Sequence, residues 1–144
     1  MDLCEITAEQ THDLRRRILL ADRPPEAVRF PRDAESIHLA IVDEGRILAI
    51  ASTHPEPMTG DAREGDWRLR GMAVDDRLQR GGIGSKLLLA FVDRVAGEGA
   101  SRLWFNARTH AAGFYAKHGF TQHGDVFDIE HVGPHVVMYR DVAG

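Results

Sequence analysis

The sequence predicts an α/β (α+β) domain in which helices flank a central, mixed and mostly antiparallel sheet. Three helical segments alternate with apolar segments of strand length, which is the pattern of a sheet covered by helices. Glycines and prolines that favour turns separate these segments. The chain has 144 residues, of which 43% are hydrophobic, and this suits one domain with its own core. We expect a single domain over residues 1–144, with the element order β-α-ββ-β-α-β-α-β-β.

The first helix is expected after a short strand at residues 3–7. Thr7 or Thr11 is predicted to cap this helix, because a hydroxyl in that position accepts a hydrogen bond from an unpaired amide of the first turn. The arginines at residues 15–17 are expected on the solvated face of the helix, since arginine is seldom buried.

The strands are predicted from alternating polarity and from short apolar runs that end at turn residues. The seven predicted strands cover residues 3–7, 36–42, 46–53, 67–74, 102–107, 120–127 and 135–140. Asp43, Glu44 and Gly45 join the second and third strands as a hairpin. The fourth and fifth strands are separated by a helix, so we expect them to be parallel with a right-handed crossover.

The central helix is predicted over residues 82–96, where apolar side chains recur at helical spacing and two glycines follow. The apolar stripe consists of Ile83, Leu87, Leu88, Phe91 and Val95. A shorter helix is predicted over residues 109–118, with Thr109 as its cap and Gly119 as its stop.

Composition and charge exclude several classes of function. The 18 Lys and Arg against 22 Asp and Glu leave a net charge of 18 − 22 = −4, whereas a general nucleic-acid binder shows a basic excess. No apolar stretch is long enough to cross a bilayer, and the first ten residues lack the pattern of a signal peptide. Cys4 has no second cysteine with which to form a disulfide, so we expect a cytoplasmic protein.

A glycine-rich turn, Gln79-Arg80-Gly81-Gly82-Ile83-Gly84, lies between a predicted strand and the central helix. The start of a helix presents backbone amides without helical partners and the positive end of the helix dipole, and glycine lets a phosphate approach them closely. A plain tight turn that needs positive φ is the alternative interpretation. The spacing matches neither the phosphate loop G-x-x-x-x-G-K-[ST] nor the dinucleotide loop G-x-G-x-x-G.

Two motifs in order resemble the GNAT N-acetyltransferase superfamily. The first is Gln-x-x-Gly-x-Gly after a strand that ends in Met72-Ala73-Val74, and the second is an A-x-x-x-Y-x-x-x-G-F pattern that runs from Ala111 to Phe120. The resemblance extends over about residues 36–140. It implies the GNAT fold and acetyl-CoA as co-substrate.

The resemblance also implies a set of site residues. Tyr115 corresponds to the tyrosine that assists departure of the CoA sulfur. The position of the family's asparagine before the second motif is occupied by Arg108, and Asn106, two residues earlier, is the candidate for a contact with the pantetheine or the 3′-phosphate. Arg77 is a further candidate for contact with phosphate. The positions implied to bind acetyl-CoA, mainly through the backbone, are Met72, Ala73, Val74, Gln79, Arg80, Gly81, Gly82, Ile83, Gly84 and Ser85.

The general base is not identified by the sequence. Residues 67–74 contain no acid, and Asp66 lies just before them. Histidines have the ordinary pKa for the task, but the sequence singles out none of the candidates, which are His38, His110 and His135.

The segment 123–135 is rich in histidine and acids. His131 and His135 have the spacing of a helical metal pair, but Gly133 and Pro134 between them break a helix, and we predict no metal site. We expect this segment to be the loop between the last two strands, on the acceptor side that the resemblance implies.

The predicted function is transfer of an acetyl group from acetyl-CoA to the amine of a small molecule or of an exposed protein or peptide, by direct attack in a ternary complex. Two alternatives stay open: a non-catalytic acyl-CoA-binding or regulatory module, and a metal-dependent enzyme that uses the C-terminal histidines. Dimers are common in the family that the chain resembles, so the resemblance leaves a homodimer open. It does not identify the acceptor.

Overall fold

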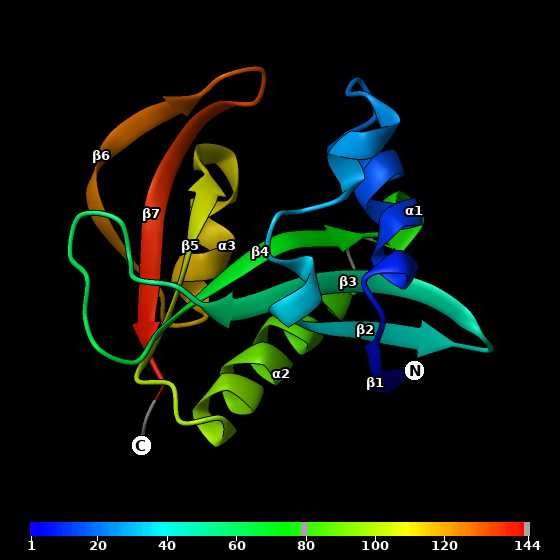
Figure 1. Ribbon diagram of the computed structural model, residues 1–144, viewed down its shortest axis with the longest axis horizontal. Helices are drawn as coiled ribbons and strands as arrows, with labels where there is room; N and C mark the ends of the chain where they lie inside the picture. Colours follow the sequence, from blue (N-terminus) through cyan, green and yellow to red (C-terminus); the bar gives the residue numbers. More distant parts are fainter. Residues whose placement is uncertain (79–80, 143–144) are drawn as a thin grey trace. The chain divides into compact units, whose positions relative to one another are not determined.

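The computed structural model describes residues 1–78 and 81–142 (Figure 1). The chain divides into two compact units, and each is described by itself. Unit 1 comprises Met1–His54 and Leu69–Phe91, and unit 2 comprises Pro55–Arg68 and Val92–Gly144.

Seven strands in the described residues form a sheet with the order β1-β2-β3-β4-β5-β7-β6. They are β1 (Asp2–Ile6), β2 (Ile37–Asp43), β3 (Arg46–Pro55), β4 (Asp66–Val74), β5 (Arg102–Arg108), β6 (Thr121–Ile129) and β7 (Gly133–Asp141). β1 with β2, β2 with β3, β5 with β7 and β6 with β7 are antiparallel, whereas β4 and β5 are parallel, with Asp66 opposite Arg102. The predicted fold class, with its mixed and mostly antiparallel sheet, is confirmed.

The helices lie where the sequence predicts them. The first helical stretch consists of a 3-10 turn (Glu9–Thr11), α1 (His12–Leu14) and a π-helical turn (Arg15–Leu19). The longest is α2 (Ile83–Gly97), and α3 (Ala112–Lys117) follows a 3-10 turn (Thr109–Ala111). Further 3-10 turns are Pro25–Val28, Asp33–Glu35 and Asp76–Leu78. No helix in the described ranges is both long enough and apolar enough to span a membrane.

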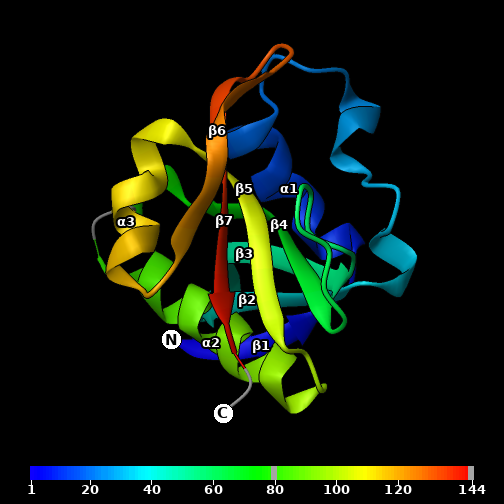
Figure 2. The same ribbon diagram turned by 90° about the vertical axis from the view of Figure 1, so that its left-hand side faces the viewer.

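The core of unit 1 covers both faces of its strands. On one face, Leu14 of α1 packs with Ala40 and Ile50. Leu39 and Ile41 alternate with Ala40 along β2 and therefore point to the other face, on the side where α2 lies (Figures 1 and 2). The predicted apolar stripe of α2 is buried: Ile83, Leu87, Leu88, Phe91 and Val95 are each at most 4% exposed.

The sequence predicts threonine caps for the first and the third helix, and the structure agrees with the two predictions to different degrees. Thr7 and Gln10 form the reciprocal hydrogen bonds of a capping box, because the Thr7 hydroxyl accepts from the Gln10 amide while the Gln10 side chain accepts from the Thr7 amide. The N-cap position of the first 3-10 turn is Ala8 and that of α1 is Thr11, and neither makes a side-chain cap hydrogen bond. The prediction that Thr109 caps the third helix is wrong. Thr109 lies inside the 3-10 turn, whose N-cap position is Arg108, and no side-chain cap is formed there.

The prediction that residues 15–17 lie on a solvated face is wrong for Arg15. Arg16 and Arg17 are exposed, but Arg15 is fully buried. Its guanidinium forms an ion pair with Asp33 and also donates a hydrogen bond to the Ser52 hydroxyl, at 2.9 Å. Partners from two distant segments therefore compensate the buried charge, and these partners are invisible to helical periodicity.

The strand predicted over residues 120–127 is present as β6, but the expectation of a loop over residues 123–135 is wrong. β6 continues to Ile129, and β7 begins at Gly133, so only a short turn separates the two strands. β6 is the last strand of the sheet order, and most of its side chains are exposed. Edge strands tolerate polar side chains and charges, so the composition of β6 resembles that of a loop.

Unit 2 contains a buried ion pair. Arg102 at the start of β5 donates two hydrogen bonds to Asp66, at 2.8 and 2.9 Å, and both side chains are 1% exposed. Asp66 also accepts hydrogen bonds from the amides of Met58 and Arg63. One carboxylate therefore joins the parallel strand pair to the segment between β3 and β4.

We expect Asp66→Asn to lower the free energy of unfolding by about 3–5 kcal/mol at pH 7, because it leaves the buried Arg102 without its counter-charge. Burial opposes ionisation of Asp66, but the hydrogen bonds from Arg102, Met58 and Arg63 outweigh it and hold the pKa of the carboxyl below its usual value. The stabilisation is therefore complete above the unfolded pKa of about 4 and is lost as the pH falls through the lower folded pKa.

Denaturant unfolding at pH 7 and pH 3 measures both effects. Asp61→Asn is the control, because Asp61 contacts the same arginine from a side chain that is 37% exposed, and its loss is expected to lower the free energy of unfolding much less than the loss of Asp66. Equal losses in the two variants would contradict the central role of Asp66.

Candidate functional site

β4 ends in the residues that the sequence predicts to contact the pantetheine. Gly71 has φ of 65°, a left-handed conformation that favours glycine, and it introduces a kink within β4. Met72 and Val74 are half-buried, and Ala73 is buried with Leu14 in the core of unit 1. The strand end is therefore anchored on one side by a small buried residue. A glycine inside a predicted strand is the sequence signal that marks this kink.

The glycine-rich turn leads into α2. Gln79 and Arg80, both predicted to bind acetyl-CoA, lie outside the described residues. Gly81 and Gly82 are exposed, and Gly82 has φ of 78° with open space where a Cβ would lie. Ile83 is buried, whereas Gly84 and Ser85 in the first turn of α2 are half-buried.

The hydrogen bonds of this turn show which amides precede the helical ladder. The Gly81 amide donates to the Leu78 carbonyl at 3.2 Å, so it is engaged within the turn. The Lys86 amide donates to the Gly82 carbonyl at 3.1 Å. The amides of Gly82, Ile83 and Gly84 come before this bond and therefore have no i−4 partner inside α2. This is the backbone arrangement to which anions bind at helix N-termini.

Arg77 is oriented by an acid next to β4. Asp75 is 1% exposed, and it accepts hydrogen bonds from Arg77 Nε at 3.1 Å and from an Arg77 terminal nitrogen at 3.0 Å. Hydrogen bonds from Arg77 hold the pKa of the Asp75 carboxyl well below its usual range, and an Arg17 terminal nitrogen lies 3.8 Å from Asp75 Oδ2. Arg77 is thus ion-paired, and the backbone amides are the more suitable groups for phosphate.

Tyr115 lies on α3, in unit 2. Its ring packs against Phe105 with 4.4 Å between centroids, against Phe114 at 5.2 Å and against Phe120 at 6.4 Å. Burial raises the pKa of the Tyr115 hydroxyl, and the positive charge of Arg108 opposes this shift only in part. The phenol is therefore protonated throughout the neutral range and can act as a hydrogen-bond donor.

Asn106 lies on β5 opposite Val137 of β7. Its Oδ1 is shielded from solvent and has no hydrogen-bond partner within residues 1–78 and 81–142. A buried acceptor without a partner costs about 1–3 kcal/mol, which a donor on a ligand recovers. Asn106 therefore has the property expected of a residue that contacts a ligand amide or hydroxyl.

Two of the three candidate bases are buried beside hydrogen-bond partners, and the third is exposed. His38 is buried, with its ring nitrogens 2.6 Å from the Ser52 hydroxyl and 3.0 Å from the Asp33 carbonyl. His135 is buried on β7 beside the Gly133 carbonyl, and His110 is exposed. The described part of the chain contains no group of three or more His, Cys, Asp or Glu that is placed to hold a metal ion.

The fold agrees with the comparisons with known proteins. Residues 3–120 match the Acetyltransferase (GNAT) family. The chain therefore belongs to this family, and the resemblance predicted from the two motifs is confirmed.

A curated relative covers almost the full chain. It is named "Uncharacterized N-acetyltransferase YitI" of Bacillus subtilis (strain 168), and it is 34% identical over 142 residues, which are 97% of this chain and 95% of the relative. The membership and this relative support N-acetyltransferase activity.

Solved structures share the fold at low sequence identity. An aminoglycoside 6′-N-acetyltransferase complexed with coenzyme A superposes with a TM-score of 0.79 at 18% identity, over 100% of this chain and 98% of that one. The ribosomal-protein-S18-alanine N-acetyltransferase of Escherichia coli superposes with a TM-score of 0.74 at 16% identity, over 99% and 94%. These neighbours have different named acceptors, so the fold alone does not define an acceptor.

Proposed function

We propose that this protein transfers the acetyl group of acetyl-CoA to a primary amine by direct attack in a ternary complex. The observation that carries the proposal is the exposed glycine turn at the start of α2, in which the amides of Gly82, Ile83 and Gly84 precede the helical ladder. Family membership supports acetyl-CoA as the ligand of this turn.

In this proposal the backbone binds most of the co-substrate. The pyrophosphate accepts hydrogen bonds from amides of residues 82–84, with Gln79, Arg80, Gly81 and Ser85 around it. The main chain of Met72, Ala73 and Val74 binds the pantetheine and the acetyl carbonyl, and an amide near Val74 stabilises the developing oxyanion. Asn106 Oδ1 accepts a hydrogen bond from a donor group of the ligand, which satisfies an acceptor that has no partner in the part of the chain that the structure describes.

The reaction forms a C–N bond and breaks the C–S bond. The neutral amine attacks the thioester carbonyl, the sulfur leaves with the electron pair of the C–S bond, and the amine proton passes to solvent or to a general base, to which the proposal assigns no residue. Tyr115 stabilises the departing thiolate. A phenol of pKa about 10 is a weaker acid than a thiol of pKa about 8.5. The elevated pKa of Tyr115 therefore favours hydrogen bonding over complete proton transfer.

An acceptor screen tests the proposal. We expect release of free thiol from acetyl-CoA in the presence of some members of an amine panel that includes small polyamines, aminoglycosides and peptides with free N-termini. Mass spectrometry should then show the product heavier by one acetyl group in place of hydrogen. Binding of acetyl-CoA without turnover on any amine would contradict the proposal and indicate a non-catalytic acyl-CoA-binding module.

A further inference from the structure

Phe30 lies directly against the kink of β4. An ideal Cβ built on Gly71 would come 2.7 Å from Phe30 Cε2, so the edge of the aromatic ring occupies the space that any other residue would need. Phe30 is half-buried and belongs to the segment between the first helix and β2. Glycine at position 71 is thus required by the positive φ and also by the contact with Phe30.

Two arginines lie over the ring of Phe30. The Arg15 guanidinium carbon is 3.7 Å from the ring centroid, and that of Arg70 is 4.8 Å from it. Both distances are within the range of cation–π attraction, which is stronger where the cation is desolvated, as in the case of Arg15. The Arg15 Nε has no hydrogen-bond partner within the described ranges, so the contact with the ring helps compensate the burial of this cation.

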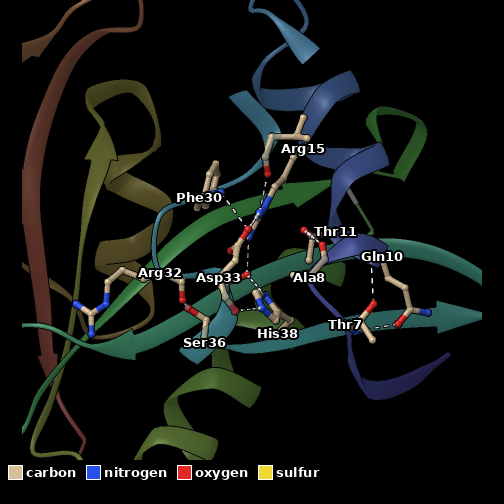
Figure 3. A network of polar contacts seen from close by, with 12 residues as sticks. Thr7, Ala8, Gln10, Thr11, Arg15, Phe30, Arg32, Asp33, Ser36 and His38 are labelled. Atoms are coloured by element: carbon tan, nitrogen blue, oxygen red, sulfur yellow. Dashed lines mark hydrogen bonds and ion pairs between the residues drawn. The ribbon is translucent and has the colours of Figure 1, made fainter. Parts of the chain in front are cut away.

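A buried ion pair holds the backbone on both sides of Phe30 (Figure 3). Arg15 donates one hydrogen bond to the Val28 carbonyl at 2.8 Å, and two to the Asp33 carboxylate at 2.7 and 3.0 Å. The same carboxylate accepts a hydrogen bond from the Phe30 amide at 3.0 Å. The main chain before and after the aromatic side chain is therefore fixed to one charged pair.

Further hydrogen bonds hold the ion pair of Arg15 and Asp33 in place. The Ser52 hydroxyl accepts from Arg15 and lies 2.6 Å from a ring nitrogen of His38, whose second ring nitrogen lies 3.0 Å from the Asp33 carbonyl. Burial opposes ionisation of Asp33, but hydrogen bonds from Arg15 and from the Phe30 amide prevail, and the pKa of the carboxyl is lowered. Two strands and the first helix thus anchor the segment that carries Phe30.

We infer that Arg15 and Asp33 clamp Phe30 against Gly71, and that this contact positions the main chain of residues 72–74 for the acetyl group. The inference rests on the proposed function for its catalytic consequence. Arg15, Asp33 and Phe30 are positioning residues, because they act through the conformation of β4. An error of about 1 Å in such positioning can cost about a hundred-fold in rate.

The clamp has a direct readout in hydrogen exchange of the β4 amides. In Phe30→Ala and in Asp33→Asn, amide exchange over residues 70–74 is expected to accelerate about ten-fold or more, because the kink loses its support. The affinity for acetyl-CoA, which the glycine turn provides, should change by less than about three-fold, while kcat falls about ten-fold or more. Phe30→Leu should show an intermediate effect, since it retains much of the apolar contact.

Arg102→Lys is the matched control, because it perturbs another fully buried arginine paired to a carboxylate, in unit 2. It is expected to lower stability without accelerating exchange at residues 70–74. If Phe30→Ala does not fold, Phe30→Leu and Asp33→Asn carry the same comparison.

The outcomes separate the clamp from the proposed function. Unchanged exchange over residues 70–74 in the clamp variants, or equal acceleration in Arg102→Lys, overturns the clamp whether or not the enzyme is active. Failure of the unmodified protein to bind acetyl-CoA overturns the proposed function, and the exchange comparison still decides whether Phe30 supports the kink.

Discussion

Gly82→Glu is expected to lower the affinity for acetyl-CoA by about five-fold to several hundred-fold. A carboxylate at about 4 Å from a phosphate charge is unfavourable by about 1 kcal/mol in bulk water and about 4 kcal/mol near a protein surface. Each 1.4 kcal/mol is about ten-fold in affinity. Because Gly82 is exposed and a Cβ on it would meet no other atom within 4 Å, the new side chain can be accommodated beside the proposed phosphate site.

Isothermal titration with acetyl-CoA measures this effect, and two variants separate charge from backbone strain. Gly82→Ala introduces the same penalty of positive φ without the charge. Gly99→Glu introduces the charge at another glycine with positive φ, 92°, and open space, but beyond the opposite end of α2. Comparable affinities in all three variants and the unmodified protein would remove the glycine turn from the binding site.

Tyr115→Phe is expected to lower kcat by about ten-fold or more, and to leave the affinity for acetyl-CoA nearly unchanged. The substitution removes the hydroxyl, but it keeps the aromatic contacts with Phe105, Phe114 and Phe120. The thiolate then departs without its proposed hydrogen-bond donor. Steady-state kinetics with a saturating acceptor amine measure kcat, and titration calorimetry measures the affinity.

Tyr139→Phe is the matched control, since Tyr139 is the other of the two tyrosines in the chain and lies on β7 beside Arg102. Its kcat should equal that of the unmodified protein within about two-fold. The raised pKa of Tyr115 adds a test with pH. The hydroxyl is protonated below its usual pKa of about 10, so its own ionisation should not reduce activity between pH 6 and about 9. An unchanged kcat in Tyr115→Phe would exclude Tyr115 from the mechanism.

The elements that the sequence predicts well are those with strong local patterns. The apolar stripe of α2 follows the helical period, and each of its members is buried. The strand pair β2 and β3 and its tight turn follow from alternation and from glycine at position 45. Each of these patterns lies within a few residues along the chain, so local conformational preference is sufficient to predict it.

The predictions that failed depend on partners outside the segment concerned. From its place in the first helix, Arg15 is expected to be solvated. In the structure its guanidinium donates hydrogen bonds to Val28, Asp33 and Ser52, which lie 13, 18 and 37 residues away along the chain. β6 resembles a loop because a strand at the edge of a sheet can expose polar side chains. In both cases the deciding energy is that of tertiary hydrogen bonds, which periodicity does not contain.

The candidate site likewise contains local features that the sequence predicts and features that depend on tertiary contacts. The glycine turn and the tyrosine segment are continuous in sequence, since a helix start that binds an anion and a short helix that carries a phenol are local structures. The sequence alone therefore determined the family, the fold class and the residues proposed to bind acetyl-CoA. Only the tertiary structure showed that Phe30 covers Gly71, that Asp75 engages Arg77, and that Asn106 presents an acceptor without a partner among the described residues. Burial and charge pairing decide these features, because desolvation makes an unpaired polar group costly and a paired one strongly oriented.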